Sequence, residues 1–515
     1  MLKTDVLVIG CGLAGATASL ELAKKGRRVL LVTNSDNLEE SNTFYAQGGI
    51  IYKDKNDPQS LIADIKKAGD GLCFTPAVEL VASLGPKLVE DFLIKELGIS
   101  FAKKDGQLHL TKEAAHNVPR IIHVQDKTGE IIQKALIAKL KKNPRIKILT
   151  GHTLIDLLTI PHHSKKLLDI YKKPFCVGAY IMDKKGLVKK IISAKTILAT
   201  GGVGQVYQRT VNSILARGDG LAAAFRAGAK TLNCEFIQFH PTSLYHSQKD
   251  NFLITEALRG EGAKLKDAKG SLFMKKYHPL ADLAPRDIVC RAIYDTMLET
   301  DTNFVYLDAV SYIAAKRLKN QFATIYKTCI EVGIDITKDP IPVVPSAHYL
   351  CGGVQTDLWA RTTLENLYAV GEVAATGLHG ANRLASTSLL ECLVYAVRAA
   401  EDIANCQDKN NIILGNIKDW QPALGREPDP ALIANDWQVI KSTMSNYVGI
   451  KRSQQGLARA VADLSYWQHR IEQFYRQSKL TAELVGLRNG IQTALIISQS
   501  SLQNKISRGC HWRVD

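Results

Sequence analysis

The amino-acid sequence predicts an α/β fold, in which a Rossmann-like domain is interrupted by a second α/β domain and followed by a helical bundle. Three features of the sequence carry this prediction. A strand, a glycine-rich turn and a helix open the chain. Two later apolar strands each end in glycines. The final segment repeats its apolar residues at helical spacing.

The opening unit has the order of elements that binds dinucleotides. An apolar run at residues 5–9 precedes the G-x-G-x-x-G sequence of residues 10–15, a helical pattern over 16–25 and a second strand at 28–32. In such a unit the glycines permit a tight turn, and the helix N-terminus accepts a pyrophosphate. The acid that usually ends the second strand is absent, so the ribose contact stays open, with Asn34 as the candidate.

The chain returns to this first domain after a long insertion. An apolar strand at residues 196–199 ends in the glycines of residues 200–204, and another at residues 366–372 is broken by a glycine and an acid. Two-domain flavoproteins return to their cofactor in this way. The insertion mixes a short strand, residues 303–307, with a helical stretch, residues 285–299, which is typical of an α/β capping domain.

The C-terminal part is predicted to be helical. Prolines interrupt a polar stretch between residues 421 and 430, and helical spacing begins at Trp437. The predicted helices cover residues 447–467, 468–477 and 481–499. The sequence therefore predicts a flavin-binding domain at 1–236 and 345–410, a capping domain at 237–344 and a helical domain at 430–515.

Composition restricts the class and the location of the protein. With 515 residues, of which 46% are apolar and 23% charged, the chain is an ordinary globular protein of several domains. The 10 cysteines are scattered without a C-x-x-C pair, which favours a reducing compartment, expected to be the cytoplasm, and no metal site. No apolar run reaches about eighteen residues, so no membrane span is expected.

The chain is strongly basic, with a formal net charge of +16. Such a charge is compatible with nucleic acid, an anionic membrane or an acidic small substrate. The densest basic stretch, residues 139–147, lacks interleaved aromatic residues and reads as a solvated helix end followed by a turn and a strand. Nucleic-acid binding is therefore not expected.

Several segments together are more specific than the opening glycines alone. Besides residues 10–15, they are the segments 42–50, 239–242, 255–262, 284–287 and 379–383. In this combination the chain resembles the succinate dehydrogenase and fumarate reductase flavoprotein family. Within that family it is most similar to the branch that oxidises L-aspartate, and the similarity extends to residues 507–511.

The resemblance implies FAD as the cofactor. The membrane-bound members carry a histidine that bonds covalently to FAD where this chain has Asn42, so noncovalent binding is expected, because an amide is no nucleophile toward the flavin. The residues implied for FAD are Gly10, Cys11, Gly12, Leu13, Ala14, Gly15, Asn42, Thr43, Phe44, Tyr45, Ala46, Gln47, Gly48, Gly49, Asp219, Glu372, Ser388 and Leu389, beside Asn34. Ser388 is expected to open a helix whose amides stabilise negative charge on the reduced flavin.

The resemblance also implies a site for a dicarboxylate. The residues implied for it are Glu113, His240, Thr255, Arg259, Arg286, His348 and Arg383. Arg383 is expected to clamp a carboxylate through two hydrogen bonds. Glu113 stands where the dehydrogenases carry an uncharged residue, and a carboxylate pairs with the ammonium group that aspartate has and succinate lacks. Read alone, Glu113 could equally be a solvated surface acid.

Arg286 is the implied acid/base. A guanidinium is a poor base at its ordinary pKa of about 12.5, so this role requires a neighbouring carboxylate network. A purely electrostatic role remains the alternative.

The implied reaction is the oxidation of L-aspartate to iminosuccinate, with O2 or fumarate as the final acceptor. In the family this is the first step of NAD biosynthesis, and a quinolinate synthase consumes the imine. Two alternatives stay open. One is a soluble fumarate reductase, and the other is a flavin-binding subunit without turnover.

Overall fold

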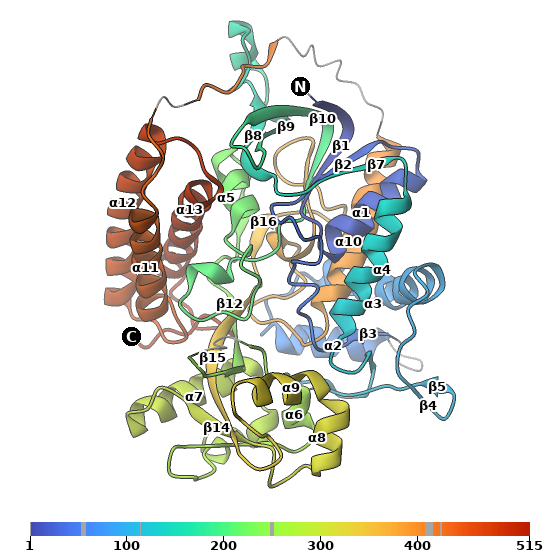
Figure 1. The fold of residues 1–515 in the computed structure, drawn as a ribbon, viewed down its shortest axis with the longest axis vertical. Coiled ribbons are helices and arrows are strands. Elements are labelled where there is room, and N and C mark those ends of the chain that lie inside the picture. Colours follow the sequence, from blue (N-terminus) through green and yellow to red (C-terminus); the bar gives the residue numbers. More distant parts are fainter. Residues whose placement is uncertain (1, 53–57, 114, 248–251, 407–415, 423–424) are drawn as a thin grey trace.

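The computed structural model describes residues 2–52, 58–113, 115–247, 252–406, 416–422 and 425–515. A large sheet with helices on both faces forms the centre of the molecule (Figure 1). A smaller α/β part lies at one end and a bundle of three long helices lies along one side. The predicted fold class is confirmed. The domain boundary expected at residue 410 falls outside the described residues.

The central sheet has the strand order β7-β2-β1-β10-β9-β8, and β17 also pairs with β10. The pairs on the β1 side run parallel, as a dinucleotide-binding unit requires, whereas β9 and β8 are antiparallel to their neighbours. The strands are β1 (Leu2–Ile9), β2 (Val29–Val32), β7 (Ile146–Leu149), β8 (Thr153–Ile160), β9 (Phe175–Met182), β10 (Val188–Leu198) and β17 (Leu367–Ala369).

Both faces of this sheet are buried, which explains the uninterrupted apolar run of β1. Val6 and Val8 point into one core, and Leu7 and Ile9 point into the other. The helices with residues in the Val6 core are α1 (Leu13–Lys24), α2 (Pro58–Ala68), α3 (Thr75–Leu88), the π-helical η1 (Val89–Glu96), α4 (Thr128–Lys142) and α10 (Ser388–Asn405). Helix α5 (Asp219–Arg226) and the C-terminal helices have residues in the Leu7 core.

The smaller α/β part has its own sheet and its own core. Its strand order is β12-β15-β14-β13, and the two long strands β12 and β15 lead from the central part into it, at the lower end of Figure 1. The elements are β12 (Ile237–Leu244), α6 (Ala257–Gly260), β13 (Lys264–Lys266), η4 (Met274–Lys276), η5 (Ala281–Leu283), α7 (Arg286–Thr300), β14 (Val305–Asp308), α8 (Ala315–Gln321), α9 (Ala323–Glu331) and β15 (Ile341–Leu350). The strand and the helix predicted in this insertion are confirmed as β14 and α7.

The C-terminal helices differ from the prediction in their bounds. They are α11 (Pro430–Tyr447), α12 (Gln454–Gln477) and α13 (Ala482–Gln503), so the two helices predicted at 447–467 and 468–477 are one. Helix α11 begins seven residues before Trp437 because Pro430 suits the first helical position and the Asp429 carboxylate accepts a hydrogen bond from the Ala431 amide (2.8 Å). The Ser453 hydroxyl caps α12 in the same way.

Short elements complete the fold. They are β3 (Ile50–Ile51), β4 (Lys103–Lys104), β5 (Gln107–Leu108), β6 (Ile121–Ile122), η2 (Leu167–Tyr171), η3 (Gly204–Val206), β11 (Thr231–Leu232), β16 (Gly353–Gln355), η6 (Gly371–Val373) and β18 (Ala374–Ala375). The basic stretch 139–147 is the end of α4, a turn and the start of β7, as predicted. Among the helices described, none has the length and apolar character needed to cross a membrane.

Candidate active site

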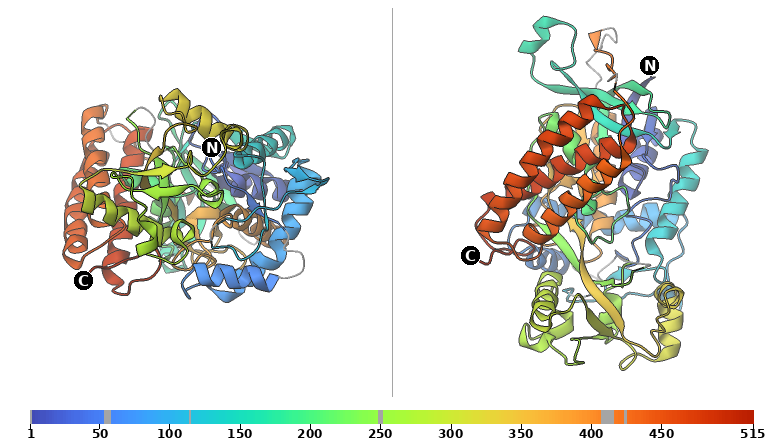
Figure 2. Two further views of the ribbon diagram at one scale, coloured as in Figure 1. Left: turned by 90° about the horizontal axis from the view of Figure 1, so that it is seen from below. Right: turned by 60° about the vertical axis from the view of Figure 1, so that its left-hand side comes forward.

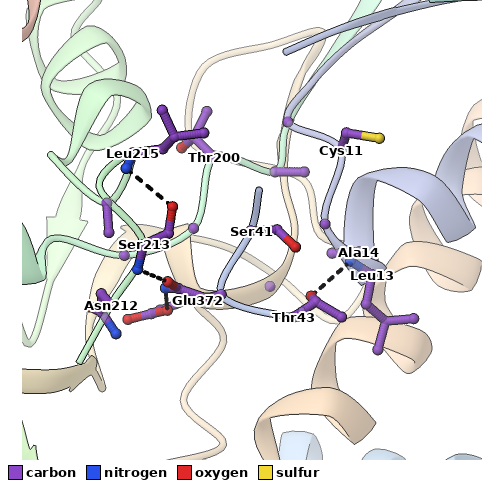
Figure 3. Close-up of a pocket in the computed structure, with 18 of the residues that line it drawn as sticks. Cys11, Leu13, Ala14, Ser41, Thr43, Thr200, Asn212, Ser213, Leu215 and Glu372 are labelled. Atoms are coloured by element: carbon purple, nitrogen blue, oxygen red, sulfur yellow. Dashed lines mark hydrogen bonds between the residues drawn. The ribbon is translucent and has the colours of Figure 1, made fainter. Parts of the chain in front are cut away.

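The turn between β1 and α1 is closed so tightly that only glycine fits. A Cβ on Gly10, whose φ is +111°, would lie 2.1 Å from the Ala199 carbonyl oxygen. A Cβ on Gly15 would lie 2.0 Å from the Gly10 oxygen. Both contacts are impossible for a side chain, so the glycines allow α1 to start directly against the end of β1. The first amides of α1 therefore face the space above the sheet, and the Leu13 amide donates to the Thr43 hydroxyl (3.0 Å; Figure 3).

A cleft of about 1370 Å³, partly open to solvent, begins at this turn. It is lined by residues from the two ends of the split domain, as Figure 3 shows around Leu13, Thr200 and Glu372. Of the residues predicted for FAD, those lining it are Gly10, Cys11, Gly12, Leu13, Ala14, Asn34, Asn42, Thr43, Tyr45, Ala46, Asp219, Glu372, Ser388 and Leu389. Its glycine-lined helix N-terminus fits the pyrophosphate of a dinucleotide.

Five of the residues predicted for FAD do not line this cleft: Gly15, Phe44, Gln47, Gly48 and Gly49. Gly15 lies against the Gly10 carbonyl oxygen and allows the turn to close. Gly49 is pressed against the β6 strand, where a Cβ would lie 2.3 Å from the Ile122 oxygen. Phe44 packs edge to face with Tyr45. These positions shape the loop that borders the cleft.

The sequence did not single out several polar groups of the cleft. They are Glu40, Ser41, His152, Thr200, Asn212 and Ser213. Ser213 illustrates the reason. Its amide donates to the Asn42 side-chain oxygen (2.8 Å) across 171 residues, and a partnership at that distance leaves no local pattern.

Asn42 is held in the cleft wall from both sides. Besides accepting from Ser213, its amide nitrogen donates to the Glu372 carboxylate (3.2 Å). Burial raises the pKa of Glu372 to about 7, against the hydrogen bonds from the Leu350 amide and Asn42 that lower it. Glu372 can therefore accept a hydrogen bond or, when protonated, donate one to a cofactor hydroxyl.

Two further residues predicted for FAD are fixed by neighbours. Asn34 follows β2, and its side-chain oxygen accepts from the Thr153 hydroxyl (3.1 Å), so its amide nitrogen is left to reach a ligand. The Asp219 carboxylate, at the start of α5, accepts from Asn489 (2.8 Å) and Arg217 (3.3 Å). Asp219 therefore lies at the cleft with its orientation set by the C-terminal helices.

Arg383 joins this cleft to a smaller cavity. It lines the large cleft together with His348, and it also lines a cavity of about 270 Å³ with Glu256 and Arg286. Its guanidinium donates to the His348 Nε2 (2.9 Å) and lies 4.4 Å above the centre of the Tyr349 ring. Its Nε has no partner among the described residues, so a donor remains for an anion.

Arg286 is fixed by two acceptors. Its Nε donates to the Glu256 carboxylate (2.6 Å) and its Nη1 to the Gln238 side-chain oxygen (3.1 Å). Burial acts to lower the pKa of Arg286, but the negative charge of Glu256 prevails and the pKa is raised. Conversely, although burial opposes it, Arg286 and Arg259 hold the pKa of Glu256 at about 2. The two form a largely buried ion pair, so a carboxylate lies beside Arg286, but both groups stay charged, which also suits the purely electrostatic role.

His240 and His348 lie side by side, with ring centres 5.2 Å apart. They lie on β12 and β15, the strands that lead into the smaller α/β part, which is the predicted capping domain. Burial, reinforced by the charges of Arg286 and Arg383, lowers the pKa of each well below the ordinary value. Both rings are therefore neutral near pH 7 and act as hydrogen-bonding groups rather than cations.

Thr255 and Arg259 lie close to Glu256 in the sequence, one before it and one after it. Both side chains are buried. The Arg259 guanidinium lies 3.4 Å from the Glu256 carboxylate and donates to the Asp282 carbonyl oxygen (2.5 Å). Arg259 therefore contributes positive charge behind Glu256.

Glu113 is buried, not a solvated surface acid. Its carboxylate accepts from the Ser386 hydroxyl (2.9 Å), and a Cβ on Gly48 would lie 3.1 Å from its Oε1. Burial and then the charge of Glu256 raise its pKa, while Arg286 and Arg383 act in the opposite direction. Glu113 therefore lies between the loop that borders the cleft and the two arginines of the smaller cavity.

The site can thus bind a small dianion beside a dinucleotide. Arg286 and Arg383 line the smaller cavity, and Arg259, His240, His348 and Glu113 act on the charges of these residues or of Glu256. Guanidinium groups stabilise bound carboxylates, and the Glu113 carboxylate suits a positively charged group on the same ligand.

Comparison with known proteins agrees with this geometry. Residues 5–389 match the family model described as an FAD binding domain, and residues 437–515 match that of the fumarate reductase flavoprotein C-terminus. The L-aspartate oxidase of Yersinia pestis is 40% identical over 99% of this chain and 96% of its own. L-aspartate oxidase 1 of Ralstonia nicotianae is 43% identical over 99% and 95%.

The solved structures point to the same fold. The flavoprotein of E. coli quinol fumarate reductase is 25% identical with a TM-score of 0.87, covering 100% of this chain and 92% of that one. Sdh1 of Mycobacterium smegmatis is 28% identical with a TM-score of 0.80, covering 99% and 89%. The chain therefore belongs to the L-aspartate oxidases, within the succinate dehydrogenase and fumarate reductase flavoprotein family, and FAD is its cofactor.

Proposed function

We propose that this protein oxidises L-aspartate to iminosuccinate. The observation that carries the proposal is the position of Glu113, a buried carboxylate that is close enough to Arg286 and Arg383 for their charges to lower its pKa, although it lines neither cavity. An aspartate bound there finds a partner of opposite charge for its carboxylates and for its ammonium group. Its carboxylates face guanidinium groups and its ammonium faces a carboxylate, whereas succinate would leave Glu113 unpaired.

Each residue of the site has a role that follows from its contacts. Arg383 and His348, held together at 2.9 Å, bind one carboxylate, and His240, Thr255 and Arg259 support the other. FAD held in the cleft would supply the acceptor for the hydride that leaves the substrate α-carbon. Formation of the imine also releases a proton from the substrate ammonium group. We assign the exchange of this proton to Arg286, which is held 2.6 Å from Glu256; because the pair raises the pKa of Arg286 and lowers that of Glu256, purely electrostatic stabilisation is the alternative role.

The products and location follow from the chemistry of the family. The reduced cofactor passes its electrons to O2 or to fumarate. The imine is unstable in water, so an enzyme such as quinolinate synthase must consume it, as the first step toward NAD. All 10 cysteines are free, which supports the cytoplasm as the location.

Anaerobic reduction of the bound flavin tests the proposal. L-aspartate should bleach the flavin absorbance of the holoenzyme, and succinate at the same concentration should not. Arg286→Leu should retain FAD but lose at least about 100-fold in the rate of bleaching, which is typical for loss of a charged acid/base group. If succinate reduces the flavin as fast as aspartate, a fumarate reductase is the better assignment. If neither does, the protein is a flavin-binding subunit without turnover.

A further inference from the structure

The loop between β8 and β9 exposes apolar side chains at its tip. Leu167, Leu168, Ile170 and Tyr171 are 91%, 78%, 70% and 87% exposed. They belong to η2, which lies at the end of the molecule opposite the capping part in Figure 1 and projects beyond the body in Figure 2. Adjacent, strongly exposed apolar residues on a monomer are uncommon and mark interaction surfaces.

Basic residues surround this tip. Lys165 and Lys166 precede it, and Lys172 and Lys173 follow it, all exposed. The single acid of the loop, Asp169, is buried: it accepts a hydrogen bond from the Ser164 hydroxyl and lies 2.7 Å from the Lys172 ammonium. The loop therefore turns its acid inward and its apolar and basic side chains outward, and the exposed apolar side chains contribute nothing to the stability of the loop itself.

The loop is anchored rather than loose. The Lys165 amide donates to the Asn416 oxygen (2.7 Å), and the Lys418 amide donates to the His163 oxygen (2.9 Å). Outside the loop, Asp419 lies 3.8 Å from Lys165 and closer, 2.6 Å, to Lys190. The apolar tip, residues 167–171, is thus held out from the body by a hydrogen-bonded base with a surplus of positive charge.

We propose that this tip docks the protein on an anionic lipid surface, with the apolar side chains inserted among the lipid headgroups and the four lysines above them. Insertion of leucine and aromatic side chains combined with lysine attraction is the usual chemistry of peripheral membrane binding. A second copy of the chain fits less well, because two such tips would bring like charges together. The cleft reaches the start of β8, at His152 and Leu154, whereas the tip follows the other end of that strand, so docking leaves the cleft free.

Vesicle flotation of the FAD-loaded protein tests the proposal. The protein should float with phosphatidylcholine vesicles that contain about a third phosphatidylglycerol, should not float with phosphatidylcholine alone, and should be released by salt. Lys166→Gln/Lys173→Gln, which keeps the ion pair of Lys172 with Asp169, should lower the partition coefficient about tenfold or more, since each lysine contributes about fivefold near such a surface. Leu167→Ser/Leu168→Ser should lower it by a similar factor.

Matched variants serve as controls. Lys141→Gln/Lys142→Gln, in the last turn of α4, removes the same charge, and Leu298→Ser/Leu432→Ser removes two other exposed leucines. Both controls should bind as the unaltered protein does, and all four variants should oxidise aspartate normally. Absence of binding to anionic vesicles, or equal loss in the controls, overturns the proposal. So does a change of molecular mass in solution confined to the tip variants, which would make the tip a protein-binding surface.

Discussion

We expect Glu113 to decide which substrate the site accepts. Replacement by Gln keeps size and hydrogen bonding but removes the charge. We expect kcat/KM for aspartate to fall by about 10- to 100-fold, the worth of a charge-assisted hydrogen bond of about 1.5–3 kcal/mol. Fumarate reduction with an artificial donor should change little, because fumarate has no ammonium group. Equal loss of both activities would make Glu113 a structural acid and would favour a fumarate reductase.

The raised pKa of Glu113 also predicts a pH dependence. Only the ionised carboxylate attracts ammonium, so kcat/KM for aspartate should fall as the pH drops through this raised pKa. The fall should begin at a higher pH than for an ordinary glutamate. In Glu113→Gln this acidic limb should be absent from the profile. An unchanged limb in the variant would assign the titration to another group.

We expect Tyr349 to position Arg383. Its ring lies 4.4 Å beneath the guanidinium, and its hydroxyl donates to Glu391 (2.9 Å), which also lies 3.0 Å from His379. Tyr349→Leu removes the aromatic face, which is worth about 0.5–2 kcal/mol, so KM for dicarboxylates should rise by about 2- to 30-fold. Tyr349→Phe keeps the face and should preserve KM. If Phe is as damaging as Leu, the hydroxyl and not the ring holds Arg383.

The site residues could be predicted only where a local segment carries them. Gly10 and Gly15 are visible because strand, turn and helix follow in order. The pairing of Glu113 with Ser386 spans 273 residues, and that of Asn42 with Glu372 spans 330. Such contacts arise from the return of β10 and β17 to the same sheet. No spacing in the sequence encodes them, which is why Ser213 and Glu40 were missed.

Helix α1 is the element on which cofactor binding depends most directly. In Gly15→Ala the new Cβ would lie 2.0 Å from the Gly10 oxygen and must push the helix away from β1. Overpacking of this kind costs about 1–3 kcal/mol, so the affinity for FAD should fall by about 10- to 100-fold in a titration of the apoprotein.

Gly26→Ala provides the control at the other end of the same helix. Gly26 has a φ of +81° and nothing within 4 Å, so the substitution strains the backbone without touching the cleft. It should lower stability and leave FAD affinity unchanged. Equal affinities in the two variants would show that the position of α1 does not limit binding.

The bounds of the C-terminal helices show what local patterns leave out. Residues 447–467 and 468–477 were predicted as separate helices, yet Leu464, Ile471 and Tyr475 are buried against the same core and lie on one helix. Tertiary packing overrides weak propensity in this way. The βαβ unit was predictable because its signals are local and mutually consistent.

At the level of the whole molecule, the FAD cleft exists only when distant parts of the chain have assembled. Residues from the first 46 positions, from 199–219 and from 370–392 line it together. A ligand of such a site binds the folded chain alone and stabilises it by about 2.7 kcal/mol at a hundredfold excess over Kd. We therefore expect Tm to rise steadily with FAD concentration.

FMN lacks the adenylate half and is the matched control for this experiment. It cannot span from α1 to Glu372, so it should raise Tm far less than FAD at the same concentration.

Because Asn42 offers no nucleophile, acid precipitation should release all of the flavin into the supernatant, and the washed chain should regain its stability on adding FAD. Flavin fluorescence retained on the denatured chain would show a covalent link, and Tm would then no longer respond to added FAD.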